Sequence, residues 1–177
     1  MNCLYSNKLI ALQGGEFYSD KINLVLTEIG PHLTILYLVH VDEIDMSALK
    51  SVSRHCPHLT TLGLYNCDFQ ERLREESQDD LYFPSLRQKD EMEPLLDLST
   101  LALVSECPVQ AAVLLLSAAI NINHFKTGFN CHLTDQNVLE VVEKNAMSQL
   151  RSWNMPASKH LTMKTVELLL SNCDHLQ

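Results

Sequence analysis

The chain lacks the long apolar run that a membrane-spanning helix needs. Its longest nearly apolar stretch, Val109 to Ile122, has 14 residues, whereas a helix that crosses the hydrocarbon core needs about 20. The segment from Met1 to Gly15 contains no basic patch followed by an apolar stretch and a small-residue cleavage site, so no secretory signal is predicted. We therefore expect no contact with a membrane and a location in the cytoplasm or the nucleus.

Cysteine, glycine and basic residues are also few. Six cysteines in 177 residues are too sparse for a disulfide-stapled secreted scaffold, so we expect reduced thiols. The five glycines are scattered, and Gly14-Gly15 lacks the lysine and the serine or threonine that complete a phosphate-binding loop. The net charge of −9 argues against a nucleic-acid partner, which needs a clustered basic face. The sequence predicts no catalytic residue, no cofactor and no metal.

What the sequence does contain is a short apolar pattern, Leu-x-x-Leu-x-Leu, that recurs with a spacing of 26 residues. This spacing falls within the range of about 20 to 29 residues that is typical of leucine-rich repeats. The two-residue step of the last two leucines suits a strand, and the apolar residues that follow at three-residue steps suit one face of a helix. The pattern occurs at Leu33-x-x-Leu36-x-Leu38, Leu59-x-x-Leu62-x-Leu64 and Leu150-x-x-Trp153-x-Met155.

The residues after each strand recur at fixed offsets. Counted from the middle apolar residue of the strand, the next core position is expected eight residues on, and two helix positions follow after a further five and three. Oxygens of Asp45, Ser47, Thr134, Asp135 and Thr162 can accept hydrogen bonds from the free N–H groups at the helix starts. The expected core positions are Leu9, Phe17, Ile22 and Val25; Leu36, Ile44, Leu49 and Val52; Leu101, Val109, Leu114 and Ser117; Phe125, Leu133, Val138 and Val141; and Trp153, Leu161, Val166 and Leu169.

One repeat is thus a strand, a turn and a helix, and neighbouring copies must stack to bury both layers. The predicted fold class is α/β: a leucine-rich-repeat solenoid, or horseshoe, with short parallel strands on the concave face, helices on the convex face and about six repeats. Neither end resembles a capping repeat, so we expect a fragment of a longer protein. Strands are expected near Leu9, Leu36, Leu62, Leu101, Phe125 and Trp153, and Leu176 would begin a seventh.

The repeat register fails between Cys67 and Leu98. Residues 68–97 contain ten acidic and four basic side chains, which is a net −6 of the chain's −9. We therefore predict an N-terminal block of repeats (1–67), an acidic insertion (68–97) and a C-terminal block (98–177). Two interpretations of the insertion stay open: a solvated loop, or a loop that speeds association with a basic partner. Within it, Leu81 to Leu86 is either a degenerate strand or an anchor.

A cluster of cysteine and histidine residues suggests a metal site at first sight. His55, Cys56, His58 and Cys67 are of types that bind zinc. The repeat favours another interpretation, because two Cys/His pairs occupy equivalent positions, where a small buried cysteine suits the corner between helix and strand. These pairs are Cys56 and His58, 12 and 14 residues after Ile44, and Cys173 and His175, 12 and 14 residues after Leu161.

A second recurring position lies three residues after the last strand leucine, where Cys67 and Asn130 stand. A short side chain there can bond backbone groups of the turn, so both residues are expected to be structural. The apolar stretch Val109 to Ile122 is likewise expected to be a buried helix of the fold rather than a partner-binding segment.

Recognition is expected on the strands, whose residues alternate between the core and the concave face. The alternating residues are small, polar and partly aromatic, which suits a protein or peptide partner. Tyr37 is the natural anchor, because aromatic side chains dominate interface energetics; the alternative is that these residues are merely solvated. The predicted partner-binding residues are Ile35, Tyr37, Thr61, Gly63, Thr100, Ala102, His124, Lys126, Ser152 and Asn154.

The leucine spacing, Cys-Pro-His-Leu at 56–59, Asn-Cys-Asp-His-Leu at 172–176 and Leu-Thr-Asp at 133–135 together resemble the cysteine-containing subtype of leucine-rich repeats, over about 150 residues. That subtype is familiar from F-box leucine-rich-repeat proteins, in which the solenoid captures a substrate for a cullin-type ubiquitin ligase. The resemblance implies non-catalytic substrate recognition in ubiquitin-dependent protein degradation.

This chain departs from that pattern in two ways. No F-box precedes the repeats, so the ligase adaptor is an expected partner only through an F-box outside this chain, and Asn145 replaces the helix-end cysteine. Two alternatives therefore stay open: an intracellular scaffold or adaptor unrelated to ubiquitin, and a metalloprotein or enzyme that uses the Cys/His residues.

Overall fold

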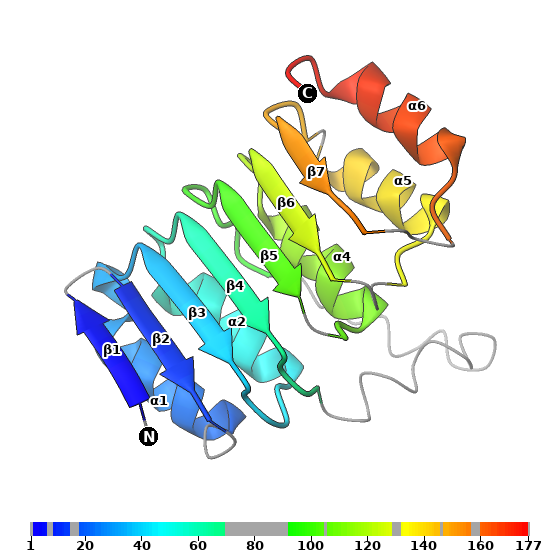
Figure 1. Ribbon diagram of the computed structural model, residues 1–177. Helices are drawn as coiled ribbons and strands as arrows, with labels where there is room; N and C mark the ends of the chain where they lie inside the picture. Colours follow the sequence, from blue (N-terminus) through cyan, green and yellow to red (C-terminus); the bar gives the residue numbers. More distant parts are fainter. Residues whose placement is uncertain are drawn as a thin grey trace, which may run out of the picture.

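The computed structural model describes residues 2–6, 9–14, 18–69, 92–104, 106–128, 132–145, 147–156 and 160–176. In these ranges the chain is an α/β structure in which the helices cover one face of a seven-stranded sheet (Figure 1). The strands are β1 (Asn2–Ser6), β2 (Leu9–Gln13), β3 (Ile35–Val39), β4 (Thr61–Tyr65), β5 (Thr100–Val104), β6 (His124–Thr127) and β7 (Ser152–Asn154). The helices are α1 (Ser19–Ile29), the 3-10 helix η1 (Gly30–His32), α2 (Met46–His55), α4 (Val109–Ala118), α5 (Asp135–Lys144) and α6 (Met163–Asn172).

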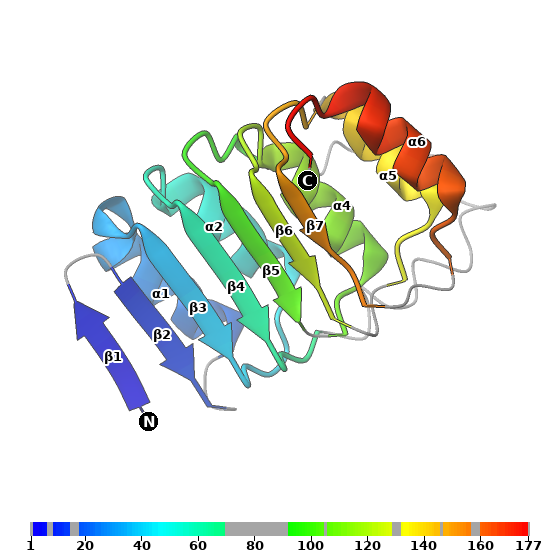
Figure 2. The same cartoon turned by 45° about the horizontal axis from the view of Figure 1, so that its top comes forward.

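The strands lie across the sheet in chain order, so β1 and β7 form its two edges (Figure 2). Strands β2 to β7 are parallel to one another, as the alternation of strand and helix requires. The α/β class and the strands expected near the six apolar positions are thus confirmed. Within the described ranges, none of the helices combines the length and the apolar character needed to cross a membrane.

The parallel register places equivalent repeat positions side by side. A row of apolar residues runs from Leu36 through Leu62 and Leu101 to Phe125 and the partly buried Trp153, each paired with the next. Neighbouring residues of a strand point to opposite faces of the sheet, so this row lies on the helix side. Leu36, Leu62 and Leu101 are fully buried. Phe125 meets Trp153 edge to face, with the ring centroids 5.0 Å apart, which adds a directed aromatic contact to the row.

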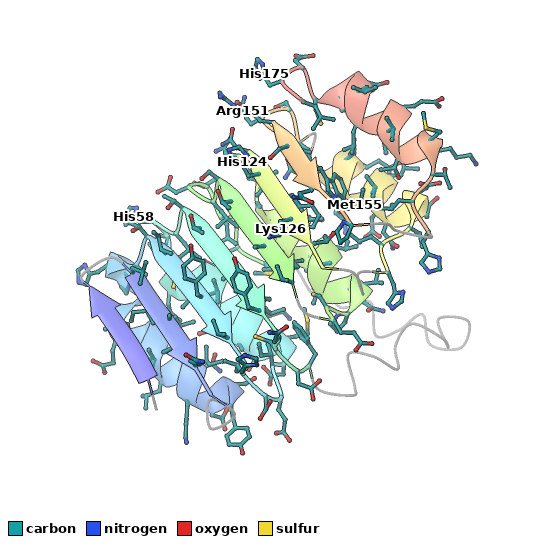
Figure 3. The ribbon with its side chains drawn as sticks, in the orientation of Figure 1. His58, His124, Lys126, Arg151, Met155 and His175 are labelled. Carbon is teal, nitrogen blue, oxygen red and sulfur yellow. The ribbon has the colours of Figure 1, made fainter. Side chains whose placement is uncertain are left out.

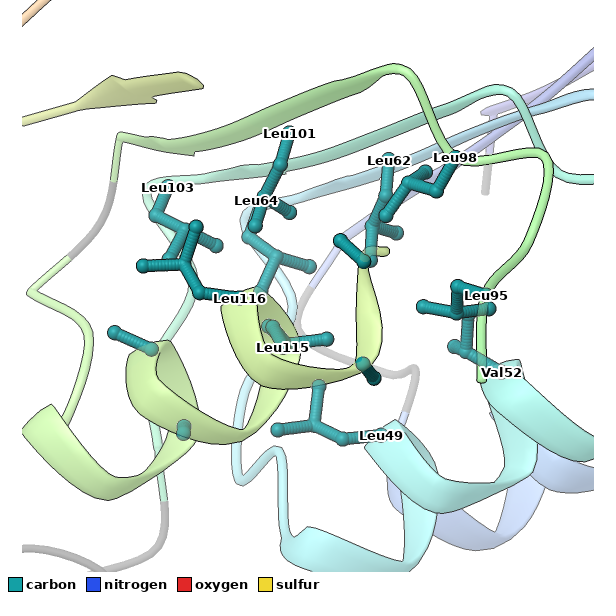
Figure 4. Close-up of a cluster of buried hydrophobic side chains, with 14 of the residues drawn as sticks. Leu49, Val52, Leu62, Leu64, Leu95, Leu98, Leu101, Leu103, Leu115 and Leu116 are labelled. Carbon is teal, nitrogen blue, oxygen red and sulfur yellow. The ribbon is translucent and has the colours of Figure 1, made fainter. Parts of the chain in front are cut away.

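Helix α4 closes the core under the centre of the sheet. Leu116 points from α4 toward Leu103 of β5, and Leu115 lies beside Leu49 of α2, while Leu101 lies on the neighbouring part of β5 (Figure 4). All five side chains are at most 1% exposed. The prediction of a buried helix in the apolar stretch 109–122 is therefore confirmed, with Ala111, Ala112, Val113, Leu115, Leu116 and Ala118 as its buried residues.

The predicted core position in β2 was wrong by one residue. Ile10, not Leu9, pairs with Leu36, and Ile10 is 1% exposed. The 26-residue period counted back from Leu36 gives Ile10, whereas the eight-residue offset to Phe17 favoured Leu9, and the pairing shows that Ile10 faces the helices.

The predicted core positions after Leu101 were wrong by two residues. Helix α4 begins eight residues after Leu101, directly after Pro108, whereas α2 begins ten residues after Leu36. The shorter turn moves the buried side of the helix by two residues. Val109, Leu114 and Ser117 are therefore only partly buried, and Cys107, Ala112 and Leu115 take the core positions.

The predicted helix starts are confirmed for three residues. Asp45 Oδ1 accepts a hydrogen bond from the Ala48 N–H at 2.9 Å. Thr134 Oγ1 accepts a hydrogen bond from the Asn137 N–H, and the Asn137 side chain accepts one from the Thr134 N–H, which together form a capping box. Thr162 Oγ1 accepts a hydrogen bond from the Lys164 N–H.

The other two predicted residues bond differently. Ser47 donates to Asp45 Oδ1 at 2.9 Å rather than accepting from a backbone N–H. Asp135 accepts from the next unit: from the Thr162 N–H at 2.8 Å, and from the hydroxyl groups of Thr162 and Thr165, both at 2.6 Å. These bonds lower the pKa of Asp135 from 3.8 to about 2.

Hydrogen bonds of the same kind join the first residue of α1 to the start of α2. Ser19, the first residue of α1, accepts a hydrogen bond from the Asp45 N–H at 3.0 Å and donates to the Glu43 carbonyl at 3.1 Å. Burial tends to raise the pKa of Asp45, but hydrogen bonds from the Ala48 N–H, Ser47 and Ser19 outweigh it and hold this pKa below its ordinary value. At two places, then, the side chain of the first residue of one helix accepts a hydrogen bond from the backbone N–H of the N-cap residue of the next helix.

The ends of the helices carry the predicted cysteines. Cys56 and Cys173 are the C-cap residues of α2 and α6 and are at most 3% exposed. Asn145 holds the same place after α5. It is 8% exposed, and its Nδ2 donates to the carbonyls of Leu116 and Ala119 at 3.2 and 2.8 Å. The predicted burial of the helix-end cysteines is therefore confirmed. Asn145 adds a side-chain donor to two carbonyls at the end of α4, which also accept from the N–H groups of Ala119 and Ile122 at 3.3 Å.

The outer side of α6 departs from the predicted core. Leu49 and Val138, the equivalent residues of α2 and α5, are at most 1% exposed, whereas Val166 is 43% exposed. Met163 and Leu170, one helical turn to either side, are 68% and 62% exposed. Among the described residues no further helix covers this side, so the prediction of a buried Val166 was wrong.

Two further findings concern regions that the sequence pattern did not describe. β1 pairs antiparallel with β2, from Asn2 opposite Gln13 to Ser6 opposite Leu9, although residues 2–6 carry no repeat signature. Residues 70–91 of the predicted acidic insertion, with its segment Leu81 to Leu86, lie outside the described residues, as do Phe17 and Asn130. Because β4 pairs with β5, the chain on either side of residues 70–91 contributes to one sheet.

Candidate functional site

The ten predicted partner-binding residues lie together on the face of the sheet opposite the helices. We call this surface the sheet face; it is the side turned to the viewer in Figure 3. The strand register arranges the ten residues in two rows that cross β3 to β7. The first row is Ile35, Thr61, Thr100, His124 and Ser152, and the second is Tyr37, Gly63, Ala102, Lys126 and Asn154.

Two tyrosines dominate the sheet face over β3 and β4. The rings of Tyr37 and Tyr65 meet edge to face, with their centroids 5.8 Å apart. Both lean over Gly63, since a Cβ on Gly63 would clash with Tyr65 Cε2 and lie 2.7 Å from Tyr37 Cδ1. Partial burial and the neighbouring Tyr37 raise the pKa of Tyr65, so its hydroxyl group stays protonated at neutral pH. The glycine thus allows the two rings to pack low against the strands.

Small side chains continue from the tyrosines across β5. Ala102 pairs with Gly63 and is 6% exposed, while Thr61 and Thr100 beside them are partly buried. A surface of this kind lets an incoming chain approach the strands closely, because no long side chain stands over it.

The other end of the sheet face is polar and basic. Lys126 and His124 are exposed on β6, and Asn154 is exposed beside Lys126 on β7. A hydrogen bond of 2.8 Å joins His124 Nδ1 to Ser152 Oγ. Figure 3 shows Arg151 at the start of β7, on the same side of the molecule as His124. The sheet face is therefore aromatic at one end and basic at the other.

In the part of the chain that the structure describes, no acidic side chain balances Lys126 or Arg151. None of the strands that the structure describes contains Asp or Glu. Among the described residues, no carboxylate lies within ion-pair distance of Lys126 or Arg151. The acidic residues that do pair lie elsewhere, such as Asp97 with His58 and Glu140 with Lys144. The local charge of the sheet face is thus opposite to the net charge of the chain.

The sequence prediction missed Arg151, Val39, Tyr65 and Val104, and on β2 also Leu9, Ala11 and Gln13, which continue the rows beside Ile35, Tyr37 and Val39. Val39, Tyr65 and Val104 stand one two-residue step beyond the predicted second row and are aligned with one another. Carrying the alternation one step further along each strand would have found them. Arg151 lies directly before β7, at a position where the period of the strand has not yet begun, so the alternation contained no signal for it.

The Cys/His cluster does not converge. Cys56 is buried in the core with a free thiol, and burial raises its pKa to about 12. His58 is exposed and lies 3.2 Å from Asp97, while the Cys67 thiol donates to the Leu38 carbonyl at 3.2 Å, as predicted for this position. In the part of the chain that the structure describes, no group of three or more His, Cys, Asp or Glu side chains is placed to hold a metal ion.

The arrangement suits recognition by contact. A broad face with an aromatic pair, small residues and exposed basic groups can bury apolar area and form ionic contacts with an extended segment. Comparisons of the chain with protein-family models, with curated proteins and with solved structures found no match.

Proposed function

We propose that this chain is a non-catalytic protein- or peptide-binding module, a leucine-rich-repeat solenoid whose concave surface is the sheet face. The alignment of ten predicted residues on one side of a continuous parallel sheet carries this proposal. The buried row of leucines and the buried helix-end cysteines support the repeat assignment, because each occupies its repeat position.

The biological role that we propose is recognition of a substrate for a ubiquitin ligase, in the cytoplasm or the nucleus. This part of the proposal rests on the resemblance to F-box leucine-rich-repeat proteins, carried by Cys56, Cys173 and the leucine spacing. The ligase adaptor would then bind through an F-box outside this chain. A scaffold that binds partners through the same surface, without any ubiquitin connection, is the alternative.

Crosslinking from the two sides of the sheet tests the binding surface. A photoreactive amino acid replaces Thr100 on the sheet face, or Glu140 on the outer side of α5 as the matched control, and the full chain is expressed in cells. We expect a defined set of proteins to crosslink from position 100 and not from position 140. Equal capture from both positions, or none from position 100, would overturn the binding surface.

Co-purification then separates the two roles. If the crosslinked proteins are substrates of a ubiquitin ligase, inhibition of the proteasome raises their amount, and the gene product that contains this chain co-purifies with the cullin adaptor. Partners whose amount does not change and a product that never binds the adaptor would favour the scaffold.

A further inference from the structure

The chemistry of the sheet face points to one kind of partner. Resting on the binding function proposed above, we propose that the sheet face binds an extended acidic segment in which a bulky apolar side chain and a carboxylate lie a short distance apart. The apolar side chain packs on Tyr37 and Tyr65, and the carboxylate reaches Lys126, with Arg151 as a second cationic contact.

The spacing follows from the register. Tyr37, Gly63, Ala102 and Lys126 belong to one row, so Lys126 lies three strands away from Tyr37. Neighbouring strands are about 4.8 Å apart, which places the two ends of this row about 14 Å apart at their backbones. An extended segment rises about 3.3 Å per residue, so its anchor and its carboxylate are separated by roughly three to five residues.

The middle of the row explains why an extended segment fits. The Tyr37 and Tyr65 rings cover Gly63, but Ala102 beyond it carries a small side chain, and Thr61 and Thr100 are short. The backbone of a partner can therefore lie close to the strands between its two contacts. The threonine hydroxyl groups offer hydrogen bonds to it.

Charge complementarity selects an acidic partner. Lys126 and Arg151 are exposed, and within the described ranges of the chain no carboxylate lies beside either of them. A basic partner would meet these cations with nothing to neutralise them. Because the remaining surface is rich in acidic groups, the local positive charge also directs an acidic segment to this end of the sheet face.

Selection from a random peptide library tests the proposal. The full chain is immobilised and peptides of about 12 residues are selected on it, because this length spans the row with residues to spare. The affinity of the enriched peptides is then measured by fluorescence polarisation. We expect enrichment of Asp or Glu at roughly three to five residues from a Leu, Phe, Tyr or Trp. Raising the salt concentration should weaken binding, because the contact with Lys126 is exposed.

Four variants locate the binding. Lys126→Glu and Tyr37→Ala are each expected to weaken it about tenfold or more, while Lys126→Arg retains it. Lys21→Glu, which makes the same charge change on the helix side, should leave binding unchanged. Circular dichroism and thermal melting confirm that each variant is folded before its binding is compared.

The outcomes separate this inference from the function on which it rests. If the enriched peptides are neutral or basic but lose binding on Tyr37→Ala, the sheet face is still the binding surface and the acidic partner is wrong. If no peptide is enriched, or if the enriched peptides bind Tyr37→Ala and Lys126→Glu as they bind the wild type, both proposals are overturned.

Discussion

Replacing Gly30 by alanine tests how closely the helices of neighbouring units must pack. Gly30 is the C-cap residue of α1 and has helical backbone angles, φ −50° and ψ −42°, so alanine causes no backbone strain there. An added Cβ, however, would lie 2.5 Å from the carbonyl oxygen and 2.9 Å from the carbonyl carbon of His55, at the end of α2. Since these are backbone atoms, no side-chain rotation relieves the contact, and the two helices must move apart.

Two effects of opposite sign set the expected magnitude. Overpacking of this kind costs about 1–3 kcal/mol, whereas glycine to alanine in a helix gains about 0.5–1 kcal/mol. We expect the crowding to win, with a net loss of about 1–2 kcal/mol and a fall of roughly 2–8 °C in Tm, given about 2–4 °C per kcal/mol for a chain of this size.

Urea denaturation and thermal melting measure the change. Glu28→Ala, on the exposed side of the same helix, is the control and should stay within about 0.5 kcal/mol of the wild type. The double variant Gly30→Ala, His55→Ala should show no rescue, because alanine keeps the Cβ and the carbonyl that crowd position 30. A Gly30→Ala variant as stable as the wild type, or more stable, would refute the close contact between α1 and α2.

Three further predictions concern the core, a helix end and a helix start. Leu36→Asp or Leu62→Asp places an unpaired charge at a fully buried position, which costs several kcal/mol. We therefore expect circular dichroism to show that the neighbouring units unfold, and an unchanged melting curve would refute the register. Asn145→Ala leaves buried carbonyls of Leu116 and Ala119 without their side-chain donor. We expect a loss of about 1–3 kcal/mol in urea denaturation, and a loss near zero would mean that other donors replace the amide. The pKa of Asp135 is lower in the folded chain than its ordinary value, so its stabilising effect is complete above pH 3.8 and disappears as the pH falls toward about 2. Melting of Asp135→Asn and of the wild type as a function of pH should therefore differ most above this range and converge below it, and a constant difference would contradict the lowered pKa.

The sequence predicted the fold class because burial leaves a period in the chain. Leu36, Leu62 and Leu101 repeat at one position of a strand, and the structure pairs them in one buried row. The same period did not reveal the length of each turn. Because the turn before α4 is two residues shorter, the core position moved from Leu114 to Ala112. Both residues are apolar, so the composition of the stretch 109–122 gave no sign of the shift.

The remaining differences depend on contacts between units. Val166 has the residue type of a core position, but its exposure depends on whether a helix lies against α6. The site shows the same limit. Alternation predicted that Tyr37 and Lys126 share a face, whereas the contact of Tyr37 with Tyr65 over Gly63 depends on side-chain packing that no spacing encodes.

The hydrogen bonds that the N–H groups of Asp45 and Thr162 donate to the side chains of Ser19 and Asp135 give the chain a direction of assembly. In each case the earlier helix supplies the side chain, and the later helix receives it at its first turn. Forming the first turn is the least favourable step of helix formation, so α2 and α6 begin most easily once α1 and α5 are already in place. Folding of these pairs should thus proceed from the N-terminal member to the C-terminal one, in the order in which the ribosome releases them.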